Sequence, residues 1–132
     1  MRELLPKNWG SSSMAKNSRN NREFETFKRE FKKWQDKFGL LGYHVYFKHE
    51  PCGSDSYATI NVAQSAMVAT AILNAQITAE EKKHRDLKAT AKHEAIHLLV
   101  HRLENLAYAR FLDDSEIVEA SEELVRRLAR LL

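Results

Sequence analysis

The sequence has a single cysteine, Cys52, so it cannot form a disulfide within the chain and offers no pair of thiolates for a zinc site. It lacks any run of about 18 apolar residues, the length that spans a membrane, and its first ten residues carry no apolar block of the kind that directs export. We therefore expect a cytoplasmic protein with no membrane partner. Any bound metal ion must be held by histidine and carboxylate side chains.

The composition is that of one folded domain. The chain has 132 residues, of which 43% are hydrophobic and 30% charged, enough apolar material for a core and too much for a wholly disordered chain. Its positive charge is concentrated in residues 1–50, which carry 11 basic and 6 acidic residues, whereas residues 51–132 carry 10 and 12. Such a surplus can attract nucleic acid or another acidic partner, although spread over fifty residues it also fits a solvated face.

The first 21 residues have almost nothing to bury, and we expect residues 1–21 to form a flexible tail, in which Met14 is an alternative start. From Arg22 the pattern changes to aromatic residues at spacings of three and four, which places them on one face of a helix that ends at Gly39. These residues are Phe24, Phe27, Phe31, Trp34 and Phe38. The domain is therefore expected to span residues 22–132.

Residues 43–74 alternate between apolar and polar side chains, which predicts three short strands in a meander, a mostly antiparallel sheet. Thr78 and Glu81 have the spacing of a capping box that opens a short helix. A central helix is predicted from Asp86 to about Glu104 by its helical periodicity, and Asp113 is placed to cap a last helix. The expected fold class is α+β.

The central helix contains His93-Glu94-Ala95-Ile96-His97, an HExxH motif. Residues four apart lie on the same face of a helix, so both imidazoles can bind one ion, while the Glu lies about 100° around the helix, beside the ion. The spacing predicts His93 and His97 as Zn²⁺ ligands and Glu94 as the base that takes a proton from water on the metal. A chain of this composition would carry the motif by chance in about 3 cases in 100.

A third ligand has to come from elsewhere in the chain. The metzincin extension requires Gly and His where this sequence has Val100 and Leu103, and His101 lies about 12 Å along the helix from His93, too far to share an ion. The other donors are carboxylates of the last helix, whose apolar stripe is expected to face the core. Helix phase favours Glu122, at the border of that stripe, over Glu119 and Glu123.

The order of these elements, with HExxH on the central helix and Glu on the last one, resembles the zincin metallopeptidases of the gluzincin type. In particular, it is similar to very small zinc-peptidase-like proteins frequent in phages and prophages, whose ending resembles Glu122-Glu123-Leu124-Val125-Arg126-Arg127-Leu128. The resemblance covers roughly residues 24–132. It implies a minimal zincin-like fold, His93, His97 and Glu122 as zinc ligands, Glu94 as general base, and a bacterial or phage-infected host cell. An SprT-like assignment fits less well, because it needs a later histidine and none follows His101.

The resemblance also implies a substrate, namely a peptide or protein held along an edge strand of the sheet, here either residues 57–62 or residues 67–73. His44, His49 and Tyr108 are candidates for stabilising the tetrahedral intermediate, although each also fits an ordinary surface or packing role. The main prediction is a zinc-dependent metallopeptidase that acts as an endopeptidase. The alternative is a non-catalytic zincin-like module that recruits a protein or nucleic-acid partner. The oligomeric state is left open.

Overall fold

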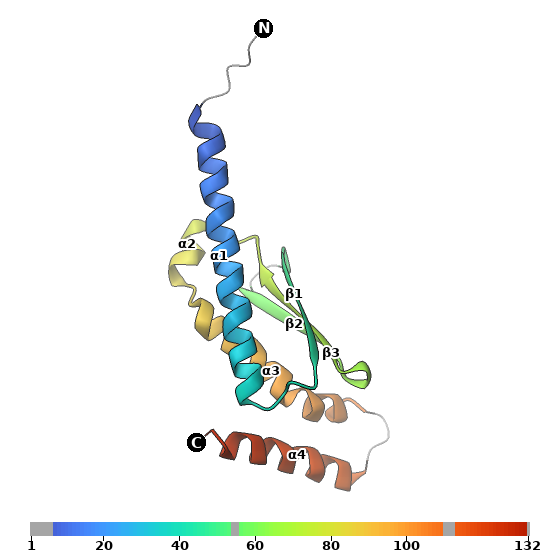
Figure 1. Ribbon diagram of the computed structural model, residues 1–132. Coiled ribbons are helices and arrows are strands. Elements are labelled where there is room, and N and C mark those ends of the chain that lie inside the picture. Colours follow the sequence, from blue (N-terminus) through green and yellow to red (C-terminus); the bar gives the residue numbers. More distant parts are fainter. Residues whose placement is uncertain (1–6, 54–55, 110–112, 132) are drawn as a thin grey trace.

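The computed structural model describes residues 7–53, 56–109 and 113–131, and for residues 7–17 it describes the backbone alone. The helices and strands follow one another in the order α1 (Lys7–Lys37), β1 (His44–Glu50), β2 (Ala58–Ala63), the short 3-10 turn η1 (Gln64–Ala66), β3 (Val68–Asn74), α2 (Ala79–His84), α3 (Leu87–Ala107) and α4 (Asp114–Ala129) (Figure 1). This is an α+β fold, as the sequence predicts. None of the helices described is long and apolar enough to cross a membrane.

The aromatic stripe of α1 faces the core, as its spacing predicts. Phe27 and Phe31 are fully buried, and both pack edge-on against Phe47 of β1, with ring centroids 6.4 and 5.4 Å away. The helix ends where Gly39 takes a positive φ of 72°, a conformation that glycine adopts without steric strain. The stripe therefore fixes α1 against the sheet.

The helix begins earlier than the sequence suggests, at Lys7 rather than Arg22. Residues 7–21 of the expected tail thus have helical backbone, because extending a helix that is already anchored by packing adds one hydrogen bond for each residue that is fixed. Asn20 also accepts a hydrogen bond of 3.1 Å from Lys82 of α2. Residues 1–6 lie outside the described part.

The three strands form a mixed sheet in the order β1-β3-β2, so the predicted meander is wrong. β3 lies in the centre, parallel to β1 and antiparallel to β2. Its burial explains this position, since the small and apolar residues from Ala69 to Leu73 tolerate neighbours on both sides. β2 is consequently an edge strand, and the alternative edge, residues 67–73, is excluded.

One face of the sheet packs against the helices. Phe47, Ala71 and Ile60 lie side by side across the three strands and belong to the core formed with α1 and α3. On the opposite face, Tyr46 and Asn61 are exposed. α3 packs against α1 on the covered face of the sheet and lies close to β2 (Figure 1). The HExxH helix is therefore next to the edge of the sheet.

The helix caps predicted at Thr78 and Asp113 are confirmed, and the structure adds a third cap at Asp86. Thr78 and Glu81 form the reciprocal capping box of α2. The Asp86 carboxylate accepts hydrogen bonds from the backbone N–H groups of Lys88 and Ala89, both at 3.1 Å, at the start of α3. Asp113 caps α4 through the N–H of Ser115. These bonds satisfy donors that have no partner within the helix, so they fix where each helix begins.

α4 is rotated relative to the orientation that its sequence predicts. Ala120 is its buried residue, whereas Val118 and Val125, on the shoulder expected to face the core, are 59% and 55% exposed. The rotation follows from polar contacts: Arg127 donates to the carbonyl oxygens of Phe38 and Gly39 at the end of α1. Because these carbonyls have no partner within α1, the guanidinium holds α4 in this phase.

Candidate metal and catalytic site

His93 and His97 lie one turn apart on α3, and the Nε2 atoms of their rings face each other. The two Nε2 atoms are 3.1 Å apart, with the ring planes at 76°. Two nitrogen ligands at about 2.0–2.1 Å from a tetrahedral ion lie about 3.3 Å apart. Both side chains are exposed, so the pair has the separation and the access that a shared metal ion requires.

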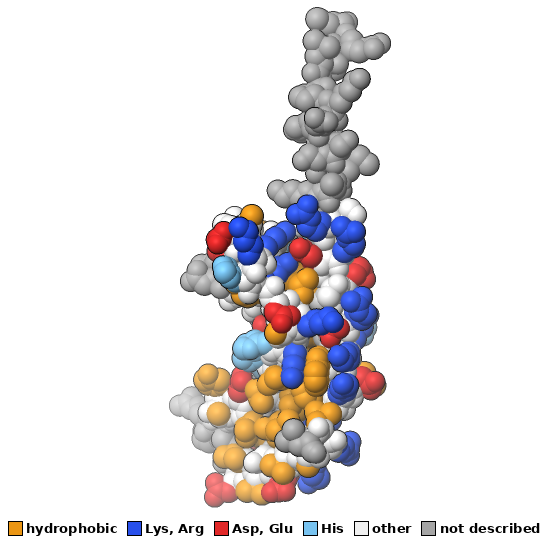
Figure 2. Space-filling view, turned by 90° about the vertical axis from the view of Figure 1, so that its left-hand side faces the viewer, with side chains coloured by type: hydrophobic (Ala, Val, Ile, Leu, Met, Phe, Trp, Pro, Cys, Tyr) orange, Lys and Arg blue, Asp and Glu red, His pale blue; other side chains and the backbone are white. Residues whose placement is uncertain are grey.

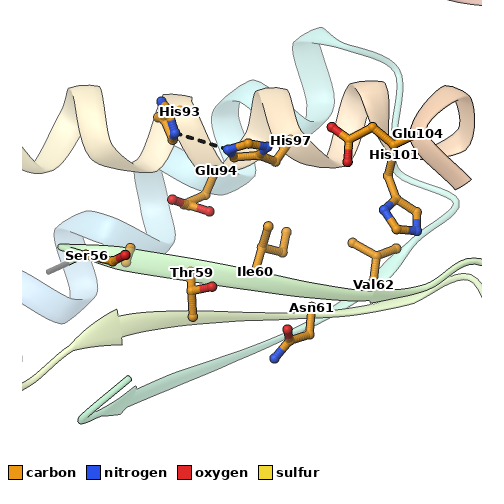
Figure 3. A pocket seen from close by; sticks show the side chains of 11 residues that line it. Ser56, Thr59, Ile60, Asn61, Val62, His93, Glu94, His97, His101 and Glu104 are labelled. Atoms are coloured by element: carbon orange, nitrogen blue, oxygen red, sulfur yellow. Dashed lines mark hydrogen bonds between the residues drawn. The ribbon is translucent and has the colours of Figure 1, made fainter. Parts of the chain in front are cut away.

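Glu94 is placed differently from its two neighbours. It is only 5% exposed, and it points from α3 toward β2, into the space below the histidine pair (Figure 3). Burial raises the pKa of its carboxyl group, and the nearby imidazoles of His97 and His93 act in the opposite direction. A carboxylate with a raised pKa is a stronger base, which suits proton transfer near neutral pH.

The three residues of the motif open into a pocket of about 560 Å³ between α3 and β2. One wall is the edge strand, from Ala58 to Val62, and the other is the face of α3 that carries His93, His97, His101 and Glu104. In the described part of the chain, β2 pairs only with β3. Its other edge faces the pocket, where an extended peptide can add to the sheet.

A second pocket, of about 410 Å³, continues this cleft beyond His93 toward α2. The two pockets share Ser56, Ala58, His93 and Glu94. The second is further lined by Tyr57, His84, Asp86, Ala89 and Thr90. The catalytic candidates thus lie in the middle of a cleft that extends to both sides of them, which suits a chain passing through better than a chain end.

The structure does not bring Glu122 to the histidine pair. It lies about 160° around α4 from the buried Ala120, at 100° per residue, and is exposed. Glu123 instead binds Arg102 and Arg127, and Glu119 binds Arg102 at 3.2 Å. Among the described residues, no three His, Cys, Asp or Glu side chains converge on one point. Glu122 as third ligand therefore stays a prediction from the sequence. In the structure, the Glu119 and Glu123 carboxylates bind arginine and Glu122 is exposed.

The other candidates for stabilising an intermediate also lie away from the pocket. His49 stacks on Phe24 with ring centroids 5.2 Å apart, His44 packs on Tyr46, and Tyr108 is 88% exposed at the end of α3. None of the three lines either pocket. Conversely, Glu104 lines the cleft and was not among the sequence candidates. Its signal is its position seven residues after His97, two helical turns on the same face.

Comparisons of the chain with protein-family models, with curated proteins and with solved structures return no match. The assignment of a function therefore depends on the geometry of the cleft.

Proposed function

We propose that this protein is a zinc-dependent peptidase with a zincin-like fold, in which His93 and His97 hold the ion and Glu94 is the general base. The observation that carries the proposal is the 3.1 Å separation of the two Nε2 atoms beside a buried carboxylate. Zinc, when bound, supplies Lewis-acid chemistry, polarising a carbonyl group and lowering the pKa of a coordinated water to about 7.

Glu94 performs the proton transfers. Its carboxylate points into the space between α3 and β2, where it accepts a proton from the attacking water and returns it to the amine that leaves. A positioned base of this kind contributes about 10²- to 10⁴-fold to the rate. Because burial raises its pKa, Glu94 takes the proton more readily than an exposed glutamate, whose pKa lies further from neutral.

The free edge of β2 positions the substrate. A peptide in extended conformation can pair with the backbone from Ala58 to Val62 and so lie along α3 across the motif. Strand addition uses backbone hydrogen bonds, which every peptide offers, and needs an unfolded stretch of substrate. We therefore expect cleavage within flexible segments rather than within folded domains.

Metal removal tests the proposal. Purified full-length protein loaded with zinc is expected to hold one ion per chain by elemental analysis and to cleave an unstructured protein such as casein. A chelator should abolish the cleavage, and added zinc should restore it. Protein that binds no zinc, or that cleaves equally well with and without chelator, contradicts the assignment.

A second candidate function, binding of nucleic acid by a non-catalytic module, is favoured by a group of lysines along one flank of α1, joined by Lys92 of α3. We call this the basic flank: Lys28, Lys32, Lys33, Lys37 and Lys92, whose ammonium groups lie 4.4 to 5.6 Å from the ring centroids of Phe24, Trp34 or Phe47. Carboxylates pair with Lys28 and Lys33; in the described part, none lies within 4 Å of the other three. Basic side chains form a vertical band in Figure 2, in the direction in which α1 runs.

Replacing Lys32, Lys37 and Lys92 together with glutamine separates the two functions. If the basic flank binds nucleic acid, affinity for a single-stranded oligonucleotide should fall and the slope of log K against log salt should decrease by about 0.7 for each phosphate that the variant no longer neutralises. A matched triple variant at Lys48, Lys83 and Lys88 serves as the control. Equal salt slopes in both variants would exclude the basic flank as the binding surface, and casein cleavage should be unchanged in either.

A further inference from the structure

The charged residues that line the cleft are all acidic. The chain has 21 Lys and Arg against 18 Asp and Glu, yet the residues that line the two pockets include Glu94, Glu104 and Asp86 and no lysine or arginine. A cleft lined by charges of one sign raises the local concentration of ligands of the opposite sign. Away from the histidine pair, where the proposed Zn²⁺ would add positive charge, the part of the cleft beside Glu104 therefore favours a cationic ligand.

The three carboxylates are not equivalent. Glu94 is buried below the histidine pair, and the Asp86 side chain is occupied by two backbone N–H groups at the start of α3. Glu104 is exposed, and within the described residues its carboxylate has no hydrogen bond or ion pair. It is thus the carboxylate that is available to a ligand side chain.

The direction of Glu104 supports this role. Side chains on a helix lean toward its N-terminus, and Figure 3 shows the Glu104 carboxylate turned back along α3 toward His97. The two residues are seven positions apart, about 10 Å along the helix. An extended peptide covers this distance in about three residues.

We propose that Glu104 selects substrates with a lysine or arginine about two or three residues from the scissile bond, on the side of the cleft toward Val62. The inference rests on the proposed function, because it assumes that a peptide lies along β2. The selection is one-sided, since Asp86 at the other end of the cleft is engaged by the cap. Glu104 is a specificity residue that contacts the substrate side chain and takes no part in the proton transfers.

Binding to the Glu94→Gln variant measures the preference without turnover. The probes are fluorescent ten-residue peptides of neutral sequence in which a single lysine, glutamine or glutamate is moved through every position. By fluorescence anisotropy we expect lysine to bind about three- to tenfold more tightly than glutamine at one or two neighbouring positions, and salt to weaken the difference. Adding Glu104→Gln should remove the preference, and Glu104→Lys should transfer it to the glutamate peptides. Glu25→Gln, which removes an exposed charge from α1, should leave it intact.

Cleavage of the same peptides by the wild-type protein distinguishes the two proposals. A lysine preference that survives Glu104→Gln, or the absence of binding to any of the peptides, overturns the role of Glu104. Peptides cleaved without regard to lysine overturn it too, while leaving the peptidase assignment intact. A preference in binding that depends on Glu104, together with no cleavage by the zinc-loaded protein, supports the role of Glu104 and contradicts the peptidase.

Discussion

The Glu94→Gln variant is expected to lose about 10²- to 10⁴-fold in the rate of casein cleavage while it still binds zinc. Glutamine has almost the same shape as glutamate and can occupy the same buried space, but it cannot accept the proton of the attacking water. The histidine pair, on the exposed side of α3, is unchanged by the substitution. Cleavage rates under substrate saturation, together with zinc content by elemental analysis, check both halves of this expectation.

The stability of the metal-free variant supplies an independent readout. Because burial raises the pKa of Glu94, the folded state favours the protonated carboxyl, and the stability that this gives at acid pH is lost as the pH rises through the folded pKa. Glutamine stays neutral at every pH. The stability of metal-free Glu94→Gln relative to the metal-free wild type should therefore increase as the pH is raised from acid to neutral. Urea unfolding at both pH values measures the gain.

Glu30 offers a matched control, since it is another buried glutamate, 7% exposed, on α1 and outside both pockets. Glu30→Gln should leave cleavage unchanged. Cleavage by Glu94→Gln at the wild-type rate would rule out Glu94 as the base and, with it, the mechanism proposed for this cleft.

Local patterns in the sequence predicted much of this fold. The aromatic spacing of α1, the caps at Thr78 and Asp113, and the HExxH motif each depend on residues within one or two helical turns of one another. Such patterns predict local structure correctly whatever the rest of the fold, provided that the helix itself forms. The approach of His93 to His97 is of this kind, because helix geometry alone places residues four apart on one face.

Strand order could not be obtained in this way. Alternation along a strand shows which face is buried, but the choice of neighbours depends on contacts that are distant in sequence. A meander was the simplest connection, whereas in the structure the buried β3 takes the central position and leaves β2 at the edge. That difference matters for the proposed function, because it places an edge strand beside the motif.

The phase of α4 is predicted only in part, since Leu124 and Leu131 of its stripe pack against the core whereas Val118 and Val125 are exposed. Its apolar residues spread over about half of the helix circumference, so the pattern fixes the buried face only broadly. The choice comes from Arg127, which reaches carbonyl oxygens that lie 88 and 89 positions earlier in the chain. A polar contact across that separation leaves no periodic trace in the sequence.

His93→Ala is expected to weaken zinc binding by more than the 10- to 100-fold that typically follows loss of a supporting hydrogen bond around a metal ligand. The substitution removes one of the two imidazoles whose Nε2 atoms lie 3.1 Å apart, and a single histidine cannot hold the ion in place. Cleavage should fall with zinc occupancy. Competition with a chromogenic chelator gives the affinity, and His97→Ala should behave in the same way.

Two further variants test whether the loss of zinc binding is specific to the histidine pair. His101→Ala lies on the same helix face, but about 12 Å from His93 along the axis, so it should bind zinc as the wild type does. Glu122→Gln should also retain zinc if α4 keeps its observed phase, in which Glu122 is exposed. A loss of affinity in Glu122→Gln that matches the loss in His93→Ala would show that α4 turns this carboxylate toward the pair when the metal binds. Unchanged zinc affinity in His93→Ala would instead remove the histidine pair as the metal site.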